Sequence, residues 1–289
     1  MRRRLRPLLV KGVVSLVVWI LVFTTVQFVW SIAPLKFHSN ITPLHLKLLF
    51  EDVRFRTADG LTLRGWFIPS ASARGTIIVT HGYPADKGDM LPLVEFLHPR
   101  YNVFLFDFRF FGQSEGRITT LGYREQEDLK AAIRYLKERG ETRIGGLGFS
   151  LGAVVLLLVQ NADLKGIVVD SAFADMERMV ETVYGYLPGA TKAPFVWLIR
   201  SYASLLGVDI GAIDPRRAIA TARQPVLIIH GAADRQIPVE HARLLAEAAP
   251  PGRAELWVIE GADHGETYAR DRKKYQKRVL TFFAKALER

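Results

Sequence analysis

The Gly-x-Ser-x-Gly pentapeptide at residues 148–152 constrains the fold of this chain more than any other feature. It joins an expected β-strand at 143–147 to an expected helix at 151–159, which is apolar almost all round and therefore suits burial against a sheet. A serine on so sharp a turn needs neighbours without side chains, because flanking Cβ atoms would collide across the turn. Gly148 and Gly152 meet that need. The pattern predicts a sheet with a serine hydroxyl exposed above it.

Short apolar runs alternate with helical patterns along the rest of the chain. A hairpin is expected at 53–57 and 61–68, and further strands are expected at 76–80, 102–106, 166–169, 226–229 and 254–259. Helices are expected at 121–139, at 239–249 and from 268 onward. Such alternation requires crossover connections and predicts a mainly parallel sheet. Residues 172–213 have no strand pattern and are rich in aromatic and methionine side chains, which indicates a helical cap.

A base must accompany the serine of the pentapeptide, because the Ser150 hydroxyl is a weak nucleophile until its proton is taken. His264 is the best candidate, since it lies in a loop between the last expected strand and the last expected helix. His98 and His241 fall on expected helices and are interpreted as surface residues. His230 ends a strand and is interpreted as a packing residue beneath the acid.

The acid that orients the base is expected to be Asp234, in the loop after the strand at 226–229. Asp170 is a rival, because it ends the strand before the cap, and the choice between these two stays open. Asp263 is a weaker rival, since neighbouring side chains in a loop tend to point apart and His264 is the next residue.

An oxyanion hole needs two backbone N–H donors held at the developing alkoxide. One is expected from Leu151, directly after the serine, and the other from Tyr83, in the loop after the strand at 76–80. Gly82 allows that loop a close approach, and His81 is expected to have a structural role.

Charge is concentrated at the two ends of this 289-residue chain, whose net charge is +10. Residues 1–35 hold five basic side chains and no acid, and residues 268–289 hold eight basic and two acidic side chains. The 26 basic and 27 acidic residues of 36–267 nearly cancel. We interpret the basic end segment as the solvated face of an amphipathic helix, and no motif indicates a nucleic-acid partner. The absence of cysteine excludes a disulfide scaffold and a cysteine-ligated zinc module.

Residues 12–35 form a run of 24 residues without a charge. As a helix this run spans about 36 Å, enough to cross a hydrocarbon core of about 30 Å. A cleaved signal peptide would have an apolar region of only about 7–15 residues. We expect an uncleaved transmembrane anchor at 12–35, preceded by a basic cytoplasmic N-terminus at 1–11 and followed by an extracytoplasmic catalytic side. A juxtamembrane linker is expected at 36–50.

Residues 51–289 resemble the α/β-hydrolase superfamily, and most of all its single-pass, N-terminally anchored serine hydrolases. These are related to lysophospholipases, monoacylglycerol lipases and serine aminopeptidases. The resemblance rests on His81-Gly82, on the stretch at 107–114 and on the loops that carry serine, aspartate and histidine in that chain order. Many relatives have D-x-R-G-x-G-x-S in that stretch, and Phe110 replaces the first glycine, which predicts altered packing beside the pocket. The resemblance implies an α/β-hydrolase fold with a small helical cap, after an N-terminal transmembrane helix.

The expected function is hydrolysis of carboxylic esters through a Ser150-Asp234-His264 triad and an acyl-enzyme. An anchor close to an apolar cap favours a lipid-type acyl ester as the substrate. The residues expected to line the substrate pocket are Met176, Met179, Tyr184 and Trp197. This chemistry needs no cofactor, and no metal-binding cluster appears in the sequence.

Two alternatives remain open at this point. An aminopeptidase-like amidase would use the same triad and an acidic group in the cap to hold a free amine, for which Asp175, Glu177 and Glu181 are available. A membrane-tethered hydrolase-like module without catalysis would be a binding protein, but the intact triad pattern disfavours it. The oligomeric state is not predicted.

Overall fold

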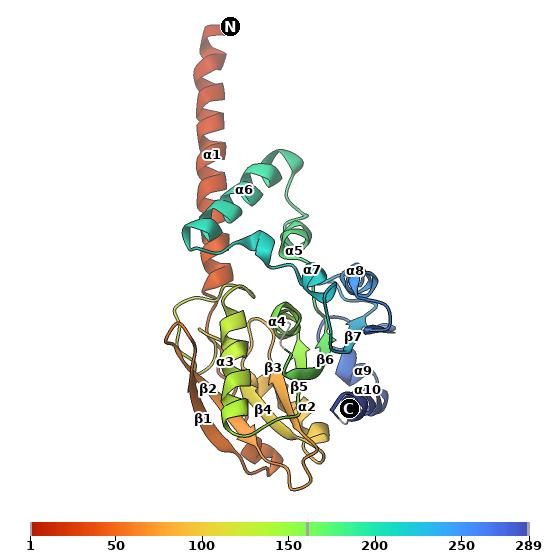
Figure 1. The fold of residues 1–289 in the computed structure, drawn as a ribbon. Helices are drawn as coiled ribbons and strands as arrows, with labels where there is room; N and C mark the ends of the chain where they lie inside the picture. The colour runs from red at the N-terminus through yellow and green to blue at the C-terminus, as the bar shows by residue number, and fades with distance from the viewer. Residues whose placement is uncertain (1, 160–161, 288–289) are drawn as a thin grey trace.

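The structure is a computed structural model, which describes residues 2–159 and 162–287 (Figure 1). Met1, the side chains of residues 2–9 and the basic terminal Arg289 lie outside this description. An α/β body carries one long N-terminal helix, α1 (Arg2–Ile32), which projects away from it.

An eight-stranded sheet forms the centre of the body, in the order β1-β2-β4-β3-β5-β6-β7-β8. The strands are β1 (Glu51–Arg56), β2 (Thr62–Ile68), β3 (Thr76–Thr80), β4 (Asn102–Phe106), β5 (Ile144–Phe149), β6 (Leu164–Asp170), β7 (Val226–Gly231) and β8 (Ala254–Ile259). β2 pairs antiparallel with β1 and with β4, and the other neighbours pair in parallel. The expected hairpin and the mainly parallel sheet are both confirmed. The strands and the hairpin were predictable because β-branched runs and a short turn are local signals.

Helices cover both faces of the sheet (Figure 1). The core of one face includes side chains from α3 (Glu125–Glu138), α4 (Leu151–Val159), α7 (Pro215–Ile219) and α8 (Glu240–Ala248). The core of the other face includes side chains from α2 (Leu91–Leu97) and α10 (Arg272–Leu287), next to the short α9 (Thr267–Arg270). Short 3₁₀ turns lie at η1 (Pro43–Leu46) and η2 (Lys87–Met90). This three-layer arrangement buries the apolar sheet on both sides, as a parallel sheet requires.

The basic helix α10 packs by its apolar stripe. Tyr275, Val279 and Phe283 are fully buried, whereas the basic Lys273 and Lys277 are exposed. The interpretation of its basic side chains as a solvated face is confirmed for the described residues.

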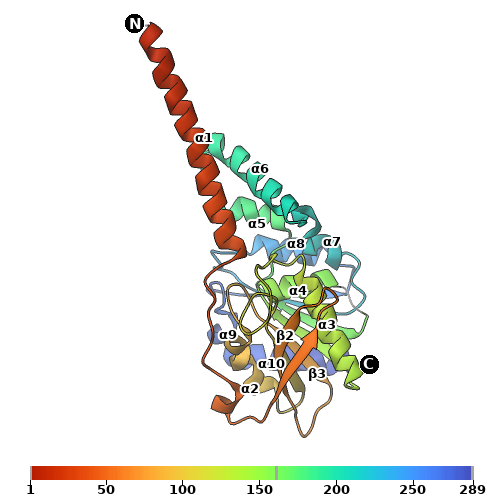
Figure 2. The same ribbon diagram turned by 90° about the vertical axis from the view of Figure 1, so that its left-hand side faces the viewer.

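A helical cap follows β6, as the sequence predicts. It contains α5 (Met176–Val183), α6 (Gly189–Leu205) and η3 (Ile210–Ala212). The helix α6 lies beside the second half of α1 (Figures 1 and 2). The Phe195 ring of α6 lies 5.7 Å from the Phe23 ring, and Tyr202 Oη lies 3.1 Å from Thr25 Oγ1. Within α1, residues Val10–Ile32 are long and apolar enough to cross a membrane.

Candidate active site

Ser150 occupies a sharp turn between β5 and α4. Its φ of 50° lies in the left-handed region, which is costly for a residue with a side chain. A Cβ at Gly148 would lie 2.6 Å from the Ala153 nitrogen, and a Cβ at Gly152 would lie 2.5 Å from the Thr80 oxygen. Both distances are too short for real Cβ atoms, so any larger residue would push α4 away from the ends of β3 and β5. The glycines therefore allow the close packing that holds Ser150 at the edge of the sheet.

His264 and Asp234 meet across the loops that follow β8 and β7. His264 Nδ1 lies 2.8 Å from Asp234 Oδ2, and the Asp234 side chain is buried. The other carboxylate oxygen accepts the backbone N–H groups of Gln236 and Ile237 at 3.0 and 2.8 Å. The buried His230 lies below, with Nε2 2.7 Å from the Ile237 oxygen and 3.5 Å from Asp234 Oδ2. These contacts fix the carboxylate so that one oxygen faces the imidazole.

Asp170 has other partners. Thr267 Oγ1 and Tyr275 Oη donate to its Oδ2 at 2.6 and 2.9 Å. Burial raises the pKa of the Asp170 carboxyl, against the opposing effect of these hydrogen bonds. The geometry therefore favours Asp234 over Asp170 as the partner of His264.

Asp263 supports the loop of His264 rather than its ring. Asp263 Oδ1 accepts the backbone N–H of His264 at 2.8 Å and that of Arg235 at 2.9 Å. The backbone N–H of Arg235, the backbone N–H of His264 and the Arg235 guanidinium together lower the pKa of Asp263 to about 2. The half-buried carboxylate thus ties the loop after β8 to the loop after β7.

The loop after β3 lies directly against Ser150. A Cβ at Gly82 would lie 2.8 Å from Phe149 Cδ1 and 3.2 Å from Ser150 Cβ, so glycine permits this approach. The buried His81 accepts the backbone N–H of Phe108 on Nε2 at 3.0 Å, and its Nδ1 therefore donates to the Gly82 oxygen at 2.7 Å. This pair of bonds fits the expected structural role of His81.

Phe110 adopts a backbone conformation that favours glycine. Its φ is 73°, in the left-handed region. Its ring is buried and lies 5.4 Å from the Phe111 ring, which in turn lies 6.0 Å from the Tyr83 ring. Neither Phe110 nor Phe111 lines the cavity described next, and the ring contacts of Phe110 reach that lining through Phe111 and Tyr83.

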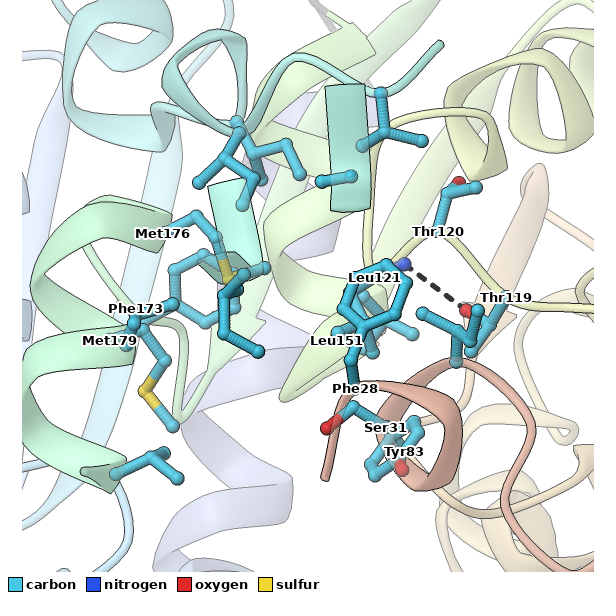
Figure 3. A pocket seen from close by; sticks show the side chains of 18 of the residues that line it. Phe28, Ser31, Tyr83, Thr119, Thr120, Leu121, Leu151, Phe173, Met176 and Met179 are labelled. Atoms are coloured by element: carbon cyan, nitrogen blue, oxygen red, sulfur yellow. Dashed lines mark hydrogen bonds between the residues drawn. The ribbon is translucent and has the colours of Figure 1, made fainter. Parts of the chain in front are cut away.

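Ser150 and His264 open into a cavity of about 270 Å³ between the body and the cap. Figure 3 shows other side chains that line this cavity, among them Tyr83 and Leu151. Tyr83 and Leu151, the expected oxyanion donors, line it too. The remaining lining side chains of the described residues are mostly apolar: Phe28, Ser31, Ile32, Thr119, Thr120, Leu121, Phe173, Met176, Met179, Val180, Val183, Tyr184, Ile199, Ala203, Leu206, Val208, Ile210, Ile213, Gln236 and Ile237. Apart from His264, this lining contains no ionisable acid or base of the Asp, Glu, Lys, Arg or His type.

The family model described as the alpha/beta hydrolase family matches residues 77–272 of this chain. The chain belongs to the alpha/beta hydrolase family. This alpha/beta hydrolase is 32% identical to the uncharacterized protein YfhR of Escherichia coli K12 over 253 residues, which cover 82% of this chain and 81% of YfhR. It is 29% identical to the uncharacterized protein YqkD of Bacillus subtilis over 238 residues, 78% of this chain and 76% of YqkD. The solved Pyrococcus furiosus esterase Pf2001 matches with a TM-score of 0.73 and 30% identity, over 88% of this chain and 99% of that one.

Three of the four expected pocket residues of this alpha/beta hydrolase lie in the cavity, namely Met176, Met179 and Tyr184. The prediction for Trp197 is wrong. Its side chain is 66% exposed on the outer face of α6, and it does not line the cavity. The sequence pattern does not show which face of α6 is buried. Packing against α1 and α5 determines that face.

The acids of the cap do not line the cavity of the hydrolase. Asp175 accepts the backbone N–H of Arg178 and caps α5, and Glu177 forms an exposed ion pair with Arg200. The described residues that line the cavity therefore include no acid that could bind a free amine.

The structure corrects the interpretation of His241 as a surface residue in the hydrolase. His241 is buried, and its Nδ1 accepts the Ala174 backbone N–H at 3.1 Å. His98 is half-buried, with Nε2 2.9 Å from the Pro69 oxygen. Each side chain connects its helix to a loop, a contact that a helical position in the sequence does not reveal.

Three cavity residues of the hydrolase come from α1 and were not predicted: Phe28, Ser31 and Ile32. Their spacing places them on one face of a helix. This spacing in the sequence could have indicated a shared face, but a uniformly apolar helix has many faces with the same spacing, so the one that lines the cavity does not stand out.

Proposed function

We propose that the chain is a serine hydrolase that cleaves carboxylic esters with an apolar acyl chain. The observation that carries the proposal is that Ser150 and His264, with Asp234 behind the imidazole, open into an apolar cavity. Such a cavity favours an acyl chain by the hydrophobic effect and provides no charged group to hold a charged substrate. The likeness to an esterase at 30% identity supports ester rather than other hydrolase chemistry.

In the proposed reaction, Ser150 Oγ attacks the acyl carbonyl while His264 Nε2 takes its proton. Asp234 accepts the Nδ1–H of His264, which fixes the tautomer and stabilises the imidazolium. The backbone N–H groups of Leu151 and Tyr83 stabilise the tetrahedral oxyanion. The imidazolium then gives its proton to the leaving alkoxide, and water, activated by His264, hydrolyses the acyl-enzyme.

We further propose that α1 anchors the enzyme in a membrane, with the N-terminus in the cytoplasm and the catalytic body outside. An 18-residue window of the segment Val10–Ile32 has a mean hydropathy of 2.2, and only 6% of that window is buried within the chain, so the window presents its apolar side chains outward. Val13, Val22 and Val26 are more than half exposed, which is costly in water and favourable in lipid. The basic residues before the segment support the cytoplasmic N-terminus.

A substrate panel tests the proposed chemistry with the full chain in detergent micelles. We expect hydrolysis of p-nitrophenyl acyl esters and single-chain glycerol esters, and much slower cleavage of aminoacyl p-nitroanilides. The reason is that no acid among the described lining residues can hold a free amine. Cleavage of the amides alone would replace the esterase proposal by the amidase, and an inactive enzyme would favour a binding module.

The proposed topology predicts the activity of a reporter enzyme that works only outside the cytoplasm. Fused after residue 289, the reporter is expected to be active, because α1 carries the body across the membrane. The same reporter fused after residue 11, before the expected anchor at 12–35, is the matched control and is expected to be inactive. The reverse result would overturn the orientation.

A further inference from the structure

The last two turns of α1 form one wall of the cavity that contains Ser150 and His264. Phe28, Ser31 and Ile32 line this cavity, whereas Val29 is 53% exposed on another face of the same helix. Figure 3 shows Phe28 and Ser31 across the cavity from Met176 and Met179 of the cap. The segment that the sequence marks as an anchor therefore reaches the candidate substrate site.

This end of α1 is fastened to the body. The backbone N–H of Thr119 donates to the Ile32 oxygen at 2.8 Å, and Tyr83 Oη donates to the Trp30 oxygen at 3.4 Å. The loop of Thr119 is held in turn by the fully buried Glu125, whose Oε1 accepts the Thr119 hydroxyl at 2.7 Å. Tyr83 belongs to the loop of the proposed oxyanion hole, so α1 touches the catalytic apparatus as well as the cavity.

The cap holds α1 from the other side. The Phe28 ring lies 5.5 Å from the Tyr202 ring of α6, below the contact between Phe23 and Phe195. The side chains of α1 that line the cavity are therefore enclosed between the loop after β4 and α6, and they present a fixed surface to whatever occupies the cavity.

We propose that α1 is part of the substrate site, and that Phe28, Ser31 and Ile32 set the length of apolar chain that the enzyme accepts. This inference rests on the proposed esterase function. The substrate class that it implies is an ester of a single long acyl chain, since such a chain can fill the apolar space between Ser150 and the end of α1. Because these three residues end the apolar segment, the chain would enter the cavity at the level where α1 leaves the bilayer.

The test compares Ser31→Phe, which adds a ring to the cavity wall, with Val29→Phe, which adds the same ring to the exposed face of the same turn. Both are made in the full chain, and kcat/KM is measured in detergent micelles for p-nitrophenyl dodecanoate and p-nitrophenyl acetate. We expect Ser31→Phe to lower the ratio of kcat/KM for the dodecanoate to kcat/KM for the acetate by about tenfold or more, because the long chain loses its space. The Val29→Phe variant is expected to keep the ratio of the wild type.

A second variant, Phe28→Ala, enlarges the cavity and is expected to shift the preferred ester towards longer acyl chains. Labelling of Ser150 by a small fluorophosphonate verifies that each variant is folded. An unchanged chain-length profile in both cavity variants, in an active enzyme, would overturn the inference and leave the esterase proposal intact. An equal effect in Val29→Phe would also overturn it, because the effect would then not depend on the side chains that face the cavity. A wild type that hydrolyses no ester would instead overturn the proposed function on which the inference rests.

Discussion

Replacing Ser150 by alanine is expected to lower kcat for ester hydrolysis by about 10⁶-fold and to abolish labelling by a fluorophosphonate. The physical reason is that the covalent intermediate cannot form without the hydroxyl, and the remaining groups then have nothing to activate. The residual rate over water would come from binding and from the two proposed oxyanion donors, which the substitution leaves in place. The measurements are steady-state kinetics and gel-based labelling of the full chain.

Ser171→Ala is the matched control for this variant. Ser171 follows β6 as Ser150 follows β5, it is also buried, and its φ of 57° is close to the 50° of Ser150. It does not line the cavity, and its hydroxyl donates to Asp170 instead. We expect Ser171→Ala to keep its labelling. Equal labelling of wild type and Ser150→Ala would show that Ser150 is not the nucleophile.

Replacing Asp234 by asparagine is expected to lower kcat by about 10⁴-fold, with a much smaller change in KM. The amide retains the size of the side chain, but it has no charge to stabilise the imidazolium and it can favour the wrong tautomer of His264. The effect should appear in kcat because the interaction strengthens when the imidazole is protonated in the transition state.

Asp170→Asn decides between the two candidate acids. The Asp170 carboxylate accepts hydrogen bonds from Thr267 and Tyr275, and an amide oxygen can accept the same bonds. We expect Asp170→Asn to keep kcat close to that of the wild type, so that its effect appears in the thermal midpoint of unfolding. A large loss of kcat in Asp170→Asn together with a small loss in Asp234→Asn would reverse the assignment.

The sheet could be predicted from the sequence because its signals are local. The runs that became β3, β4 and β8 have the predicted bounds, since each is a β-branched or apolar run ended by turn residues. The strand before Ser150 extends two residues further than predicted, up to the turn itself. The bounds of α2 were not predicted, although His98, directly after it, was assigned to a helix. Its seven residues are too few for a helical period to stand out, and Pro92 lies inside it.

The candidate site was predictable where chain order and loop position were sufficient. The predicted contact between His264 and Asp234 is present, because both loops leave the same edge of a parallel sheet. The cavity wall was predicted only in part. Trp197 faces away from the cavity and Ile32 faces into it, and both orientations depend on how α1 packs against α6. Packing between two apolar helices leaves little trace in either sequence, since each could present several faces.

The hydrogen bond between Thr119 and Ile32 has a mechanical consequence for the proposed membrane-anchored form. A helix tied to its domain by a flexible linker could tilt without disturbing that domain. Here the helix end is fastened to the loop beside the cavity, so in the proposed anchored form any tilt of α1 moves the cavity wall or must be resisted by the body. Hydrophobic segments adjust their tilt to the thickness of the bilayer. Bilayer thickness would thereby act on the shape of the substrate site, and the same chain would have different chain-length preferences in thin and thick membranes.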